Sequence, residues 1–132
     1  MKTTAERLLI KPGARVRIVG AVADAAGRLG PLPAGASLVD HASTPKADAV
    51  VFFARTGADV RTTLPEAASA AGPDGLLWLA YPKGTSGLKT DLGRDTMTAL
   101  TDPIAGLTGV TLVSIDETWS AMRLRPSERY RA

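Results

Sequence analysis

The chain has 132 residues, a hydrophobic content of 45% and a formal net charge of +3, which fits one domain with a real core. No apolar run reaches the ~18 residues of a membrane span and no signal peptide is recognisable, so we expect a cytoplasmic protein without membrane contact. The absence of cysteine excludes disulfides and thiolate chemistry, and His41 alone cannot build a histidine-rich metal site. The basic residues are scattered, so nucleic-acid binding is not expected.

The first half of the chain predicts a short helix followed by three strands. Thr3 and Glu6 have the spacing of a capping box, which favours a helix over residues 4–9. Basic and apolar residues alternate in RVRIV, as in a strand near a sheet edge, and Gly20 closes that strand. The run AVVFFA is apolar on both faces, which is typical of a central parallel strand. We expect strands at residues 15–19, 37–40 and 49–54.

The second half predicts helices and strands in alternation. Pro65 interrupts the helical stretch 58–71, so a kink or two short helices are expected there. The sequence GPDG predicts a turn that leads into the apolar run LLWLA. Asp91 is a suitable N-cap for the next helix, which Pro103 and Gly106 should end. We expect a turn at 72–75, a strand at 76–80, a helix at about 92–100, and a hairpin of strands 110–115 and 119–124.

Strands that alternate with helices predict an α/β fold with a mostly parallel, Rossmann-like sheet, flanking helices and a C-terminal antiparallel β-hairpin. On the hairpin we expect Met122 and Leu124 on the face opposite to Trp119 and Arg123, because side chains alternate along a strand. We assign residues 1–126 to a single α/β domain and residues 127–132 to a flexible basic tail.

The segments AVVFFAR, GLLWLAYPK and ETWSAMRLRP resemble small uncharacterised bacterial proteins that are grouped as a domain of unknown function. Pro82, Lys83, Trp119 and Arg123 carry this resemblance, which covers roughly residues 49–126. The order of the elements is also similar to that of class I methyltransferases, in a truncated form. The resemblance implies a methyltransferase-like fold and no particular activity.

The cofactor-binding pattern of Rossmann-like folds is incomplete in this sequence. A dinucleotide or nucleoside site needs closely spaced glycines after the first strand, but Gly20 is followed only by Gly27 and Gly30. Asp40 does stand twenty positions after Gly20, where such folds often keep an acid for ribose hydroxyls. We therefore expect no cofactor, with S-adenosylmethionine or a nucleotide as the alternative.

The loop after the strand at 76–80 is the predicted ligand site, because open α/β sheets bind ligands at the carboxyl ends of their strands. Its lysines and glycines favour an anion, and a cis Tyr81–Pro82 bond would aim Lys83 across the sheet edge. The competing interpretation is a solvated loop whose lysines point into water. The candidate ligand-binding residues are Gly20, Asp40, Arg55, Tyr81, Pro82, Lys83, Gly84, Lys89 and Arg94.

No catalytic residue and no metal ligand is assigned. Asp91 and Asp95 are better explained by helix capping than by a metal, and Asp116 and Glu117 are better explained as solvated residues at a hairpin tip. We therefore expect a non-catalytic module that binds a partner protein or forms a homodimer, with the sheet edge at the hairpin as the contact. The alternative is a binder of a small anionic or nucleoside-type ligand, or a weak enzyme, at the carboxyl ends of the strands.

Overall fold

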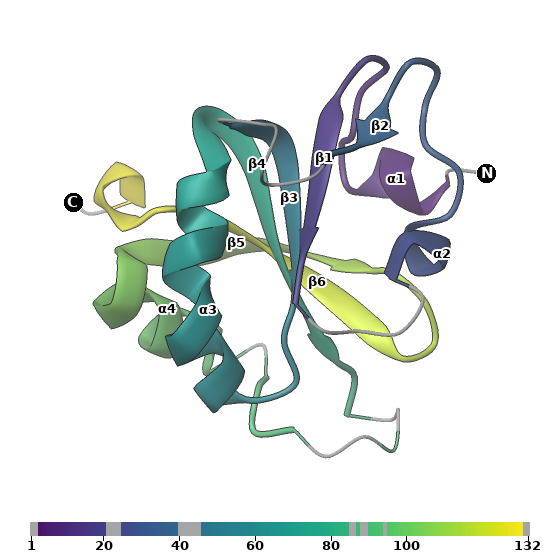
Figure 1. Cartoon of the computed structure of the whole chain (residues 1–132). Helices are drawn as coiled ribbons and strands as arrows, with labels where there is room; N and C mark the ends of the chain where they lie inside the picture. The colour runs from purple at the N-terminus through teal and green to yellow at the C-terminus, as the bar shows by residue number, and fades with distance from the viewer. Residues whose placement is uncertain are drawn as a thin grey trace.

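The computed structural model describes residues 3–20, 25–39, 46–84, 87, 90–93 and 95–130 of the chain. Helices and strands alternate along most of it (Figure 1). In chain order the elements are α1 (Thr4–Arg7), β1 (Arg15–Val19), α2 (Ala25–Leu29), β2 (Ser37–Leu38), β3 (Ala47–Phe53), α3 (Gly57–Ala70), β4 (Ala71–Pro82), α4 (Met97–Ala105), β5 (Leu107–Ser114), β6 (Trp119–Pro126) and the 3₁₀ helix η1 (Ser127–Tyr130).

The strands form a six-stranded sheet in the order β2-β1-β3-β4-β6-β5. Strands β2, β1, β3 and β4 are parallel, whereas β6 pairs antiparallel with both β4 and β5. The predicted α/β class, with a mostly parallel sheet and a final antiparallel hairpin, is confirmed.

Helices cover both faces of the sheet, with α3 and α4 on one side and α1 and α2 on the other (Figure 1). The alternation of β3 divides the core: Val50 and Phe52 pack toward α3, and Val51 and Phe53 pack toward α1. Both faces of β3 are therefore buried, as expected for a central strand. The indole of Trp78 fastens α1 to the sheet, since its Nε1 donates to the carbonyl of Leu8 at 2.9 Å.

The hairpin divides its side chains as the sequence predicts. Met122 and Leu124 belong to the core on the α3 side, and Trp119 belongs to the core on the α1 side.

Strand β4 begins earlier than the sequence predicts. Its ladder with β3 passes from the pair Ala47–Ala71 to the pair Ala49–Leu76, which is a step of five residues in β4 against two in β3. Element β4 therefore starts at Ala71, before the turn that the sequence predicts at 72–75, and its regular pairing with β3 starts at Leu76. The side chains of residues 72–74 lie outside the described part of the chain, so the turn stays a prediction.

The N-cap predicted for α4 is also wrong, because α4 starts at Met97 and Asp91 lies outside it. The Oδ1 atom of Asp91 accepts from the backbone N–H of Gly57 at 2.7 Å, at the first residue of α3. Thr56 and Asp59 form a capping box at the same end. Asp91 therefore satisfies a free N–H of a helix 34 positions earlier in the chain.

Two prolines that we expected to break helices lie inside them. Helix α3 is a single helix from Gly57 to Ala70 that contains Pro65, and α4 continues through Pro103 to Ala105. Pro65 and Pro103 are exposed, so water can reach the carbonyl groups that lose a backbone partner. Gly106 ends α4 as predicted, in the left-handed conformation with φ 66°.

The chain remains packed beyond Pro126, where the sequence places the start of a tail. Ser127 is buried, and its backbone N–H donates to the carbonyl of Gly106 at 2.8 Å. Its hydroxyl is 2.7 Å from that of Thr108. The domain therefore includes at least the first residue of η1.

Gly20 stands where β1 ends beside β3. Its φ of +104° is disfavoured for other residues, and an ideal Cβ would lie 2.2 Å from the carbonyl oxygen of Phe53. This position accepts only glycine because the two backbones approach so closely.

We expect Gly20→Ala to lower the free energy of unfolding by roughly 2–4 kcal/mol, from backbone strain and overpacking together. Gly13→Ala is the control, because Gly13 has φ +79° but no atom within 4 Å of its ideal Cβ. Urea denaturation of both variants measures the difference, and equal losses would contradict the steric argument.

Candidate functional site

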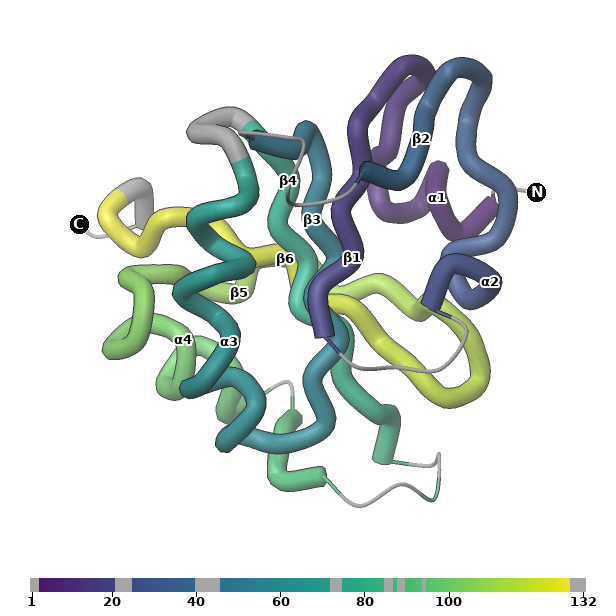
Figure 2. Tube along the Cα trace, viewed as in Figure 1, coloured from purple at the N-terminus to yellow at the C-terminus, as the bar shows by residue number. Residues whose placement is uncertain are grey.

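The carboxyl ends of the parallel strands meet at one edge of the sheet, the lower edge in Figure 2. Gly20 follows β1, Arg55 follows β3 by two residues, and Tyr81 and Pro82 end β4. The backbone N–H of Ala54 donates to the carbonyl of Ala80 at 2.9 Å, and this hydrogen bond holds the ends of β3 and β4 together at this edge. Of the predicted ligand-binding residues, Gly20, Arg55, Tyr81, Pro82 and Lys83 thus share one edge.

Of the other four predicted site residues, the structure describes Gly84. Gly84 is exposed at the start of the loop that follows β4. Asp40, Lys89 and Arg94 lie outside the described residues, as does His41.

Tyr81 and Pro82 are part of the ladder and do not form a turn. Tyr81 pairs with Ser120 and Pro82 pairs with Trp119 in the antiparallel contact between β4 and β6. The peptide bond between them is trans, so the predicted cis bond is wrong. Pairing with β6 keeps this segment extended, and a cis peptide bond would interrupt that pairing.

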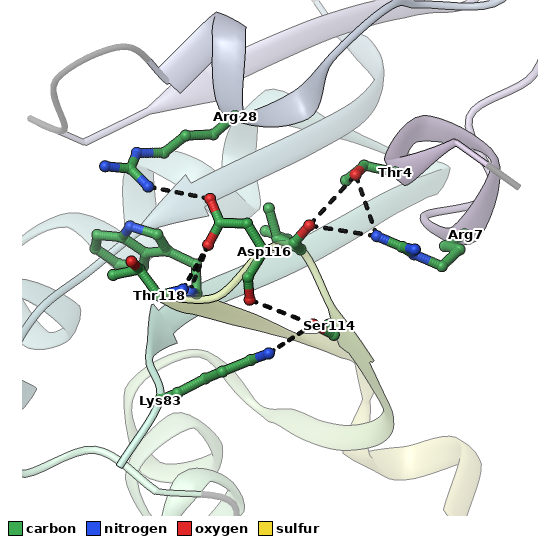
Figure 3. A network of polar contacts seen from close by, with 9 residues as sticks. Thr4, Arg7, Arg28, Lys83, Ser114, Asp116 and Thr118 are labelled. Atoms are coloured by element: carbon green, nitrogen blue, oxygen red, sulfur yellow. Dashed lines mark hydrogen bonds and ion pairs between the residues drawn. The ribbon is translucent and has the colours of Figure 1, made fainter. Parts of the chain in front are cut away.

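Lys83 lies against the hairpin (Figure 3). Its Nζ atom donates to the hydroxyl of Ser114 at 2.7 Å, and its backbone N–H donates to the carbonyl of Thr118 at 2.8 Å. The lysine therefore continues the contact of β4 with β5 and β6 beyond the ladder, and its ammonium group points toward Ser114.

Asp116 organises the tip of the hairpin (Figure 3). Its Oδ1 atom accepts from the backbone N–H groups of Thr118 and Trp119, both at 2.8 Å. Its Oδ2 atom forms an ion pair with Nη1 of Arg28 at 3.0 Å, and the guanidinium of Arg28 lies 5.9 Å from the ring centroid of Trp119. We expected a solvated residue here, but Asp116 is half-buried and fastens α2 to the hairpin.

Sequence reasoning missed Arg28, which lies 88 positions before Asp116. Only the turn was detectable in the sequence, because aspartate often accepts from backbone N–H groups two or three residues later.

A second connection joins the hairpin to α1. The carbonyl of Ile115 accepts from the hydroxyl of Thr4 and from Nη2 of Arg7, both at 3.3 Å. Trp119 packs its ring edge-to-face with Phe53, with centroids 5.2 Å apart at an angle of 82°. The packing role predicted for this tryptophan agrees with its burial.

The described residues were compared with the requirements of a metal site and of a membrane-spanning helix. Among them, no group of three or more histidine, aspartate or glutamate side chains is placed to hold a metal ion. No described helix is long and apolar enough to cross a membrane.

A family model described as "Protein of unknown function (DUF3052)" matches residues 5–128. The chain belongs to the DUF3052 family. No curated protein matches its sequence. The resemblance inferred from the Pro-Lys and Trp–Arg motifs, to a domain of unknown function, is thereby confirmed.

Several solved structures similar to this DUF3052 protein are methyltransferases. The ribosomal protein L11 methylase of Lactobacillus delbrueckii subsp. bulgaricus is 12% identical with a TM-score of 0.57, over 93% of this chain and 74% of the other. A TehB-like SAM-dependent methyltransferase of Corynebacterium glutamicum is 13% identical with a TM-score of 0.57, over 96% and 88%. The tRNA methyltransferase TrmK of B. subtilis is 11% identical with a TM-score of 0.51, over 95% and 65%. At these identities the likeness shows the fold alone, and the predicted methyltransferase-like topology is confirmed.

The contacts of Asp116 predict two different losses of stability. Asp116→Ala removes both the turn and the ion pair, and should lower the free energy of unfolding by about 2–3 kcal/mol. Asp116→Asn keeps an acceptor for the two N–H groups and loses the ion pair, whose partners are each 31% exposed, so about 1 kcal/mol or less is expected. Urea denaturation distinguishes these losses. If asparagine is as harmful as alanine, the ion pair and not the turn is the main contribution.

Proposed function

We propose that this DUF3052 protein is a non-catalytic module with a methyltransferase-like fold that acts by pairing with a second copy of itself along β5. The proposal rests on the composition of that strand. The eight residues LTGVTLVS contain no charge and no proline, although β5 lies at the end of the described sheet. Exposed edge strands usually carry lysine, proline or a bulge, which prevent pairing with another chain.

The second half of β5 is the part that remains open. In the first half, the bulge between Gly109 and Thr111 disturbs the edge, and the N–H of Gly109 donates to the hydroxyl of Thr98 in α4 at 3.0 Å. From Thr111 to Ser114 the ladder with β6 is regular. Leu112 lies in this stretch and is 41% exposed.

A second copy suits this edge better than an unrelated partner. Two antiparallel β5 strands related by a twofold axis present the same groups to each other, so one sequence satisfies both sides. A stretch without charge meets its own copy without like-charge repulsion. The opposite edge of the sheet is β2, whose two residues offer too little backbone for the same contact.

The non-catalytic part of the proposal is supported by the polar groups near the carboxyl ends of the strands. Lys83 is bonded to Ser114, Asp91 caps α3, and Asp116 orders a turn. Each has a structural partner, and groups that hold a fold together are poorly placed to change protonation or to contact a substrate.

We expect the protein to sediment as a dimer and Leu112→Lys to shift it toward the monomer, because a lysine on the edge repels its own copy. Leu38→Lys is the matched control, since Leu38 is 45% exposed on β2 at the other edge, and it should remain dimeric. Sedimentation velocity over a concentration series measures both. A wild-type monomer at every concentration contradicts the proposal, and dissociation of both variants contradicts the choice of edge.

The second candidate function is the binding of S-adenosylmethionine, a nucleotide or another small anionic ligand at the carboxyl ends of the strands. The similarity to methyltransferases favours it, since the enzymes of this fold from Corynebacterium glutamicum and Aquifex aeolicus are S-adenosylmethionine-dependent. The widely spaced glycines after β1 argue against it.

We expect no rise in melting temperature with S-adenosylmethionine or with nucleotides. A ligand of the native state at ~100 times its dissociation constant adds about 2.7 kcal/mol of stability, which thermal unfolding detects readily. A clear rise that Arg55→Gln reduces would favour the second function, because Arg55 is an exposed cation at this edge.

A further inference from the structure

A cavity of about 820 Å³ lies at the opposite edge of the sheet, where the parallel strands begin. Ala14 and Arg15 line it from β1 and the residue before it, Ala49 from β3, and Arg123 from the antiparallel strand β6. Its volume falls within the ~300–1,000 Å³ of small-molecule sites. Neither the strand-end rule nor the predicted site residues point to this edge.

The bulge of β4 borders the cavity. The residues at its end, Gly75 and Leu76, line the hollow, and β3 contributes Ala47 and Asp48 opposite them. A step of five residues in β4 against two in β3 interrupts the regular contact of the two strands. The cavity therefore lies between the starts of β1, β3 and β4 and the segment 9–13 that precedes β1.

The charge around the cavity is positive. The described residues that line it include four cations, namely Lys11, Arg15, Lys46 and Arg123, and one carboxylate, Asp48, so four minus one leaves +3 for this part of the lining. Asp48 is occupied by Arg15, whose backbone N–H it accepts at 2.8 Å and whose Nε lies 3.8 Å away. Lys46 reaches the carbonyl of Ser69 at 2.5 Å, and this carbonyl does not neutralise its charge. A ligand that fits this rim carries negative charge.

The floor of the cavity is apolar. Ile10, Ala14, Ala47 and Ala49 are buried residues that line it. A purely inorganic anion would leave the apolar floor in contact with water. A ligand that covers both the apolar floor and the basic rim has an apolar body and an acidic group.

Leu9 lines the cavity and adds exposed apolar surface to it, since its side chain is 48% exposed. Its φ of 64° lies in the left-handed region, where glycine is the usual residue. The N–H groups of Leu9 and Ile10 donate to the carbonyls of Glu6 and Ala5 at 3.0 Å and end α1. A bound apolar body would cover the exposed side chain of Leu9.

We propose that the cavity at the amino-terminal edge of the sheet binds a small organic acid, with an apolar body over Leu9 and the buried floor and its acidic group between Lys11 and Lys46. The site is separate from the dimer edge on β5 and from the carboxyl ends of the strands. Its presence does not depend on the function proposed above.

The fluorescent probe 8-anilinonaphthalene-1-sulfonate tests this site, because it combines an aromatic body with one sulfonate. Its binding is titrated by fluorescence on the intact folded protein, and two competitors of the same shape then displace it. We expect 2-naphthoate to compete and its uncharged amide, 2-naphthamide, to compete poorly. Equal competition by both would overturn the role of the basic rim.

Variants locate the site. Lys11→Gln and Lys46→Gln should each weaken probe binding about two- to five-fold, the usual range for one exposed charge contact. Arg61→Gln is the control, because Arg61 is an exposed cation of α3 that does not line the cavity, and it should leave binding unchanged. If Arg61→Gln weakens binding as much as the lysine variants do, the probe reports net charge and the proposal fails.

Leu9→Gly separates binding from stability. Glycine relieves the left-handed strain, so the melting temperature should stay the same or rise, while the lost apolar contact should weaken the probe by about ten-fold. A variant with unchanged probe affinity would overturn the contact of the ligand with Leu9. Lys11→Gln and Lys46→Gln keep the charge requirement testable if the glycine loosens the segment after α1.

Discussion

The parallel pairing of β3 with β4 is the contact on which the rest of the molecule depends. Both strands are buried in the middle of the sheet, with Val51 beside Trp78 and Phe52 beside Leu79. Because their side chains alternate, each strand supplies both faces, and a helical layer is needed on each side. The core is thus two apolar layers that share one pair of strands, and α1 is fastened to it through the bond from Trp78 to Leu8.

The hairpin connects this core to the N-terminal helices and fixes the carboxyl edge. Asp116 bonds to Arg28 of α2, the carbonyl of Ile115 bonds to Arg7 of α1, and Lys83 reaches Ser114 (Figure 3). In a fold shared with methyltransferases, the polar groups described at this edge are therefore largely engaged in holding elements together. The surfaces that remain open lie elsewhere, on the uncharged half of β5 and in the basic cavity at the other end of the strands.

The similarity to methyltransferases concerns the order of the strands, whereas the missing glycine fingerprint concerns the residues of a cofactor site. The order β2-β1-β3-β4-β6-β5 arises from strand pairing and crossover rules, which many sequences satisfy. A cofactor site needs particular residues at particular places, and Gly20 is glycine here because its backbone approaches Phe53, a structural reason that requires no cofactor. The architecture that the DUF3052 chain shares with these enzymes therefore does not by itself assign their function to it.

Local pattern determined much of the fold. The apolar runs AVVFFA and LLWLA specify central strands, the alternation in WSAMRLR assigns Met122 and Trp119 to opposite faces, and Thr3 with Glu6 caps α1 as expected. These features depend on residues a few positions apart. Tertiary structure alone decided that Asp91 caps α3, that the register of β4 against β3 shifts between Ala71 and Leu76, and that Arg28 meets Asp116. Each of these depends on a partner 24 or more positions away, and a local pattern contains no information about which distant backbone or side chain the fold brings close.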